Sequence, residues 1–114
     1  MRSCKMLINE KDLKVHFDGD EELIGELLEV FEETYPETLL AIKSSIETEN
    51  FQDLELHAHT LKGMIANFFA EDLKQKAFIL EQQGRNKEKT ELIENFNELN
   101  QKLPLLVNEL KAIL

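Results

Sequence analysis

Hydrophobic residues recur at intervals of three and four along most of this chain, which is the spacing of a buried stripe on an amphipathic helix. Polar residues fill the positions between them, and only 4 Gly and 2 Pro interrupt the pattern. The pattern predicts a short helix over residues 9–16 and longer helices over about 21–35, 36–48, 51–69, 71–83 and 90–113. Because short loops join these amphipathic segments, we expect an all-α fold: an antiparallel four-helix bundle with a short additional N-terminal helix.

Three residues predict where the helices end or bend. Pro36 disfavours helical geometry in Tyr35, so we expect a break or bend there and a new helix from Pro36. Gly84 is predicted to lie just past the end of its helix, where Gly is favoured. Pro104 interrupts the last stripe, so the last helix should kink or divide at that point.

The overall composition narrows the classes of function. With 114 residues the chain fits a single domain, 1–114, with one modest core. Its 23 acidic and 13 basic residues give a net charge of -10, which disfavours nucleic acid and anionic membranes as partners. Cys4 is the only cysteine, and no segment has the pattern of a signal peptide or a membrane span. We therefore expect a soluble, cytoplasmic monomer.

The helix over 51–69 carries chemically capable residues outside its apolar stripe. His59 lies roughly 130° from the centre of that stripe, and Lys62 and Gly63 follow one turn later on the same side. An exposed imidazole with a pKa of about 6.5 is largely neutral at cytoplasmic pH and can act as a nucleophile towards phosphorus. Lys62 is placed to offset the charge of a phosphoryl group, while Gly63 either admits a partner closely or allows tight helix packing. The stripe itself consists of Phe51, Leu54, Ala58, Leu61, Ile65 and Phe68.

A residue of the next helix is predicted to orient the imidazole. If the chain reverses near Ala70, positions equally far from that turn meet across the helical hairpin, and Glu81 is the position that matches His59. The Glu81 carboxylate, or the amide of Gln82 beside it, would hydrogen-bond one ring nitrogen and leave the other free. The alternative interpretation is a plain surface carboxylate.

These residues also carry a resemblance to a known family. The run from His57 to Asn67 reads HAHTLKGMIAN and is followed by Leu80-Glu81 and Gly84-Arg85. This arrangement resembles the histidine-containing phosphotransfer (HPt) domain. The segments 19–23 and 35–37 are similar to the same family, so the likeness covers most of the chain.

The resemblance implies a function and a set of partners. In that family a histidine accepts a phosphoryl group from a phospho-aspartate on one receiver domain and passes it to another. The likeness implies that His59 is the phosphoacceptor, that Lys62 and Gly63 support it, and that receiver domains of a hybrid histidine kinase and a response regulator are the partners. Magnesium would be held by the receiver domain. The chain itself would bind no cofactor, metal or ATP and would act as a phosphoryl carrier.

The sequence departs from the family pattern around the proposed site. The residues after Gly63 are usually small, whereas this chain has Met64 and Ile65, and Phe69 stands where a Gly is common. Ile65 belongs to the core stripe. Met64 and Phe69 either enlarge the apolar docking surface and narrow the choice of partner, or are buried.

Other histidines and other functions are alternatives to this interpretation. His57 points about 160° away from His59 around the helix, so the two cannot bind one metal ion, and we predict a packed, hydrogen-bonded structural role for it. His16 has no predicted partner. A helical interaction module without phosphotransfer would keep the same fold, and a domain phosphorylated directly by a kinase domain would keep the same histidine.

Overall fold

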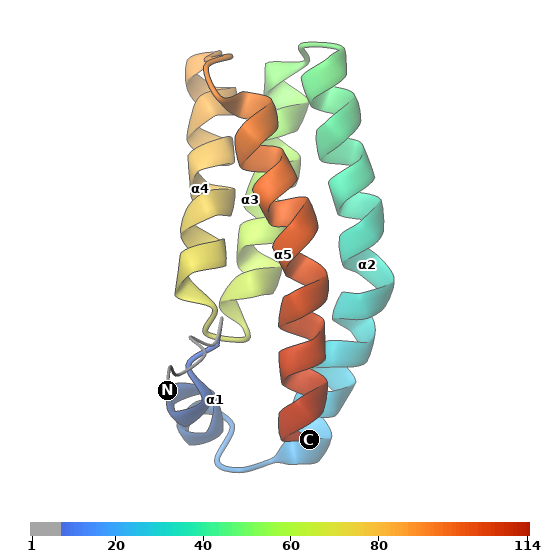
Figure 1. The fold of residues 1–114 in the computed structure, drawn as a ribbon, viewed down its shortest axis with the longest axis vertical. Helices are drawn as coiled ribbons and strands as arrows, with labels where there is room; N and C mark the ends of the chain where they lie inside the picture. Colours follow the sequence, from blue (N-terminus) through green and yellow to red (C-terminus); the bar gives the residue numbers. More distant parts are fainter. Residues whose placement is uncertain (1–7) are drawn as a thin grey trace, which may run out of the picture.

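The computed structural model describes residues 8–114, all of whose regular structure is helical (Figure 1). The helices are α1 (Glu10–His16), α2 (Glu21–Glu47), α3 (Phe51–Ala66), α4 (Glu71–Asn86) and α5 (Leu92–Ile113). The predicted all-α class is confirmed. None of these helices is long and apolar enough to cross a membrane. Cys4 lies outside the described residues.

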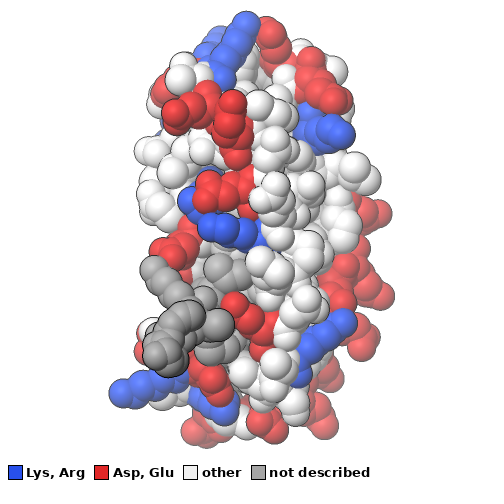
Figure 2. Space-filling model, in the orientation of Figure 1, with Lys and Arg blue, Asp and Glu red and all other residues white. Residues whose placement is uncertain are grey.

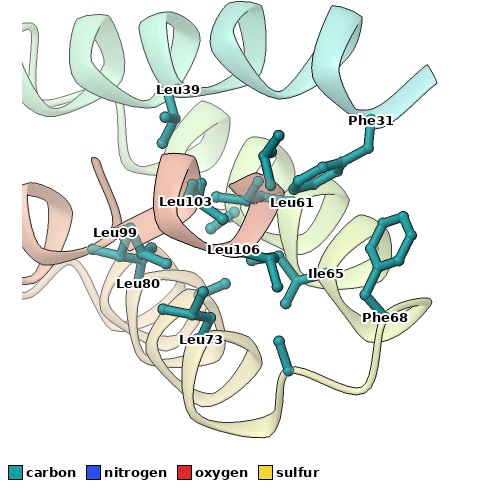
Figure 3. Packing of buried hydrophobic residues seen from close by; sticks show 14 of the residues in the cluster. Phe31, Leu39, Leu61, Ile65, Phe68, Leu73, Leu80, Leu99, Leu103 and Leu106 are labelled. Carbon is teal, nitrogen blue, oxygen red and sulfur yellow. The ribbon is translucent and has the colours of Figure 1, made fainter. Parts of the chain in front are cut away.

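The four longer helices lie side by side around a shared core, and α1 lies at one end of them (Figure 1). α2 packs against α3 and α5, and α4 packs against the same two helices. Leucine side chains dominate the interior, and those of α3, α4 and α5 converge in Figure 3. The stripe predicted for α3 is the one that is buried, with the exception of the half-buried Phe51. The largest fully buried side chains include Phe68, Leu13, Ile24, Ile42, Leu54, Leu61, Ile65, Leu73, Leu80, Leu99, Leu103 and Leu106.

Side-chain caps fix where three of the helices begin. The side-chain oxygens of Asn9, Asp20 and Asn50 each accept a hydrogen bond from the backbone N–H three residues later. Such caps satisfy donors that the first turn of a helix leaves unpaired. Leu13, on the short helix α1, is fully buried, and the Asn9 N–H donates to the Phe69 carbonyl at 3.2 Å. α1 therefore packs onto the turn between α3 and α4.

The prolines of α2 and α5 do not divide their helices, so the separate helix predicted from Pro36 is wrong and the last helix does not divide at Pro104. α2 continues through Pro36, and α5 continues through Pro104. Both prolines are exposed to solvent, where a carbonyl that loses its helical partner can be hydrated. Phe31 and Leu39, on either side of Pro36, are buried in the same core. Burial of one continuous stripe outweighs the local preference of proline to break the helix.

The end of α4 also differs from the prediction. Gly84 is buried inside this helix, which continues to Asn86 and ends where Lys87 adopts a left-handed conformation at φ 57°. A Cβ on Gly84 would lie 2.6 Å from the backbone nitrogen of Glu55 and 2.9 Å from the carbonyl oxygen of Phe51. Gly84 is therefore a site of close backbone contact between α4 and α3 rather than a helix terminator.

Candidate functional site

α3 presents His59 to solvent because its opposite face is in the core. Ala58 and Leu61, on either side of His59 in the sequence, are fully buried, whereas 65% of the His59 side chain is exposed. The imidazole is thus held by a helix that the core fixes in position. This is the orientation that the hydrophobic pattern predicts.

Glu81 of α4 binds the His59 ring. The Nδ1 atom of His59 lies 3.1 Å from Oε2 of Glu81, and only 6% of the Glu81 side chain is exposed. The hairpin argument from sequence thus identifies the correct pair. The alternatives do not apply, because Glu81 is buried and Gln82 is exposed to solvent.

Lys62 is bound to the same carboxylate. Its Nζ atom lies 2.7 Å from Oε1 of Glu81 and 4.9 Å from the centre of the Phe78 ring, and 21% of its side chain is exposed. Lys62 shares a face with His59, as the spacing predicts. Its ammonium group, however, neutralises a buried carboxylate instead of standing free in solvent.

The charges around Glu81 keep it ionised. Burial would raise the pKa of this carboxyl, but the hydrogen bonds from Lys62 and His59, together with their charges, outweigh that effect and hold the pKa below its ordinary value of 4.5. At neutral pH Glu81 is therefore a carboxylate that can only accept hydrogen bonds. Nδ1 of His59 must donate the hydrogen to it, and Nε2 is the ring nitrogen left with a free lone pair.

Arg85 joins the cluster one helical turn after Glu81. Its Nη2 atom lies 3.7 Å from Oε2 of Glu81, and its Nε atom donates to Oε2 of Glu55 on α3 at 2.9 Å. Sequence reasoning did not place Arg85 at the site because it expected α4 to end at Gly84. The spacing of four residues between Glu81 and Arg85 was the available signal.

Gly63 faces open space. A Cβ built on this residue meets no atom within 4 Å outside its own helix and its chain neighbours, and the residue is exposed. The interpretation of Gly63 as a helix-packing residue is therefore wrong. Because Gly63 has no side chain, nothing projects from α3 at this position beside His59.

Met64 and Phe69 are each half-buried rather than fully exposed or fully buried. The Thr34 hydroxyl donates to Sδ of Met64 at 3.3 Å, which ties this side chain to α2. The Phe69 ring packs on the core and lies 5.3 Å from the ring of His16. Ile65 is fully buried, as the stripe predicts.

The two other histidines do not join the His59 cluster. His57 is half-buried, but the part of the chain that the structure describes offers its ring no hydrogen-bond partner, so the predicted hydrogen bond is wrong. His16 is exposed and packs edge-on against Phe17, with ring centres 4.7 Å apart. Neither histidine has a carboxylate partner comparable to Glu81. His59 is thus the described histidine whose ring is both exposed and oriented by a buried charge.

Comparisons with known proteins show the family of the chain. The model of the Hpt domain family matches residues 26–113, and the chain belongs to this family. The family is one of phosphocarriers that work with receiver domains, and the class of function of this chain is histidine phosphotransfer in a two-component phosphorelay. No curated protein matches the chain by sequence.

A solved structure has the same fold. The chain is similar to the crystal structure of histidine-containing phosphotransfer protein B from Pseudomonas aeruginosa PAO1, with a TM-score of 0.83 and 20% sequence identity. The match covers 92% of this chain and 91% of that one. At this identity the likeness establishes the fold.

Proposed function

We propose that His59 carries the phosphoryl group, and that it exchanges this group with the receiver domains of a hybrid histidine kinase and of a response regulator. The observation that supports this assignment is the contact between Nδ1 of the exposed His59 and the buried Glu81 carboxylate. It leaves Nε2 as the nucleophile and points it away from the core. Lys62 and Gly63 support the site, Lys62 through Glu81 and Gly63 by admitting the partner.

This geometry favours a transfer step in which no proton moves and the total charge of the two partners is unchanged. The Nε2 lone pair attacks phosphorus, an N–P bond forms, and the P–O bond to the receiver aspartate breaks with its electron pair left on that carboxylate. The proton on Nδ1 stays in its hydrogen bond to Glu81, so the ring becomes positively charged. The fixed carboxylate of Glu81 stabilises that developing charge.

We infer that the partner receiver domain supplies magnesium and the aspartate, and that this chain uses no ATP and acts as a monomer. We also infer that residues 1–114 form a single domain, and that the described helices form an antiparallel four-helix bundle with α1 as an addition at one end. The colours in Figure 1 support this arrangement, because they run in opposite directions along consecutive long helices. The cytoplasmic location stays a prediction from the sequence.

Incubation with a phosphorylated receiver domain tests the assignment of His59. The wild-type chain is expected to acquire an acid-labile phosphoryl group, and His59→Gln is expected to acquire none. His57→Gln is the matched control, because it makes the same change two residues away on the same helix and should leave labelling intact.

Two outcomes would contradict the proposal. Label that persists on the His59→Gln variant would place the phosphoryl group elsewhere. A wild-type chain that accepts phosphate from an isolated kinase domain, but from no receiver domain, would make it a direct kinase substrate instead of a relay carrier.

A further inference from the structure

A phosphoryl group on Nε2 of His59 would enter a strongly acidic environment. It brings nearly two negative charges to a chain whose net charge is already -10. Figure 2 shows acidic side chains gathered along the edge of the molecule where α2 lies. At the site itself the buried Glu81 carboxylate touches the ring, and Asp53 and Glu55 line a hollow of about 420 Å³ beside it. A nearby cation is needed to offset this repulsion.

Lys62 is poorly placed to pair with the phosphoryl group. Its ammonium lies 2.7 Å from Oε1 of Glu81, and its side chain is mostly buried against Phe78. If it turned to the phosphoryl group, the Glu81 carboxylate would lose its closest counter-charge while still buried, which is costly. Lys62 therefore stabilises the site through Glu81 in both states.

Arg85 is a cation whose side chain can change its partner at little cost. Its side chain is 61% exposed and lines the hollow that also contains His59. Its ion pair with Glu55 lies at the surface, where such pairs contribute little to stability. Its Nη2 atom already lies 3.7 Å from the Glu81 oxygen that holds the His59 ring. A guanidinium can donate two parallel hydrogen bonds to phosphate oxygens, which suits this task.

We propose that Arg85 leaves Glu55 when His59 is phosphorylated and pairs with the phosphoryl oxygens, and that Glu55 holds Arg85 in its resting position. This inference rests on the proposed role of His59. It assigns to Arg85 the contact with the phosphoryl group that sequence reasoning gave to Lys62. Glu55 is a positioning residue, because it acts only by competing for Arg85.

The test is a titration of the phosphoryl group by ³¹P NMR after labelling with phosphoramidate, a small donor that removes any effect of partner docking. A bound cation favours the dianion, so Arg85→Ala is expected to raise the proton affinity of the phosphoryl group by about tenfold, the size of one charge-assisted hydrogen bond. Arg85→Lys should restore part of this effect. Glu55→Gln should lower the proton affinity, because it frees Arg85 and removes a negative charge.

A second exposed ion pair supplies matched controls. Lys89 and Glu49 interact at 3.1 Å, and neither lines the hollow beside His59. Lys89 is about as exposed as Arg85, and Glu49 is more exposed than Glu55. Lys89→Ala and Glu49→Gln change the net charge by the same amounts and should leave the titration unchanged.

The outcomes separate the two proposals. A resonance that Arg85→Ala moves no further than Lys89→Ala would overturn the role of Arg85 while leaving His59 as the carrier. If the wild-type phosphohistidine resonance survives in the His59→Gln variant, the proposed site itself is wrong.

Discussion

Gly84 and Gly63 lie on facing helices, and the structure uses them in opposite ways. Gly84 is buried where α4 meets the backbone of α3, so closely that a Cβ would lie 2.6 Å from the Glu55 nitrogen. Gly63 is exposed, and a Cβ on it would meet nothing within 4 Å. Both glycines reduce helix propensity by about 1 kcal/mol relative to Ala. Gly84 gains a close helix contact in return, whereas Gly63 gains no such contact from residues 8–114.

This difference separates residues that hold the site together from residues that serve a partner. The contact at Gly84 sets the distance between α3 and α4, and with it the position of Glu81 against His59. Gly63 contributes nothing to that distance. This open space is what the proposed docking of a receiver domain on α3 requires.

Gly84→Ala should produce the largest loss of stability. The added methyl group meets backbone atoms that cannot turn aside, so α3 and α4 must separate locally, and overpacking of this kind costs about 1–3 kcal/mol. Thermal unfolding followed by circular dichroism measures the loss. An unchanged or raised midpoint would contradict the close contact at this residue.

Glu81→Gln should have the next largest effect, about 1.5 kcal/mol, because the ion pair between Lys62 and the buried carboxylate is lost and Lys62 keeps no counter-charge. Urea unfolding measures the free energy. The matched control is Glu98→Gln, since Glu98 also pairs with basic side chains, those of Lys76 and Lys102, but at the surface. An equal loss in both variants would show that burial of Glu81 is not what matters.

The lowered pKa of Glu81 also predicts that the stability of the folded chain depends on pH. The pKa of Glu81 is lower in the folded chain than its ordinary value of 4.5, so its contribution to stability is fully present above that pH. The contribution is lost as the pH falls through the lower pKa of the folded state. The gap in unfolding free energy between wild type and Glu81→Gln should therefore be constant near neutrality and close in acid. A gap that does not narrow in acid would contradict the ionised state of Glu81.

Gly63→Ala should have the smallest effect on stability, and in the opposite direction. The methyl group has open space around it, so helix propensity alone should stabilise the chain by up to about 1 kcal/mol. Transfer from a phosphorylated receiver domain should nevertheless slow, because the partner meets the new methyl group. Labelling by phosphoramidate, a small molecule, should not change. Equal slowing with both donors would contradict a role in partner access.

The periodicity of the chain was sufficient to orient His59, because a helix buries the stripe that the sequence provides. Ala58 and Leu61 belong to that stripe, so His59 has to face solvent. Glu81 could also be found from sequence, because two helices joined by a tight turn near Ala70 bring matching positions together. These inferences depend on one helix or one hairpin, where local geometry is regular.

Other features depend on distances between helices, and no local pattern contains them. Pro36 remains inside α2 because the residues on both sides of it are buried in one core, which outweighs its local tendency to break a helix. Gly84 looks like a helix end in the sequence, and only the approach of α3 gives it a packing role. The sequence by itself determined which face of each helix is buried and that His59 faces solvent. Tertiary structure decided that Lys62 binds Glu81, because the buried carboxylate of Glu81 requires a cation as its partner. It also decided that Arg85 lies between Glu81 and Glu55, because α4 packs against α3.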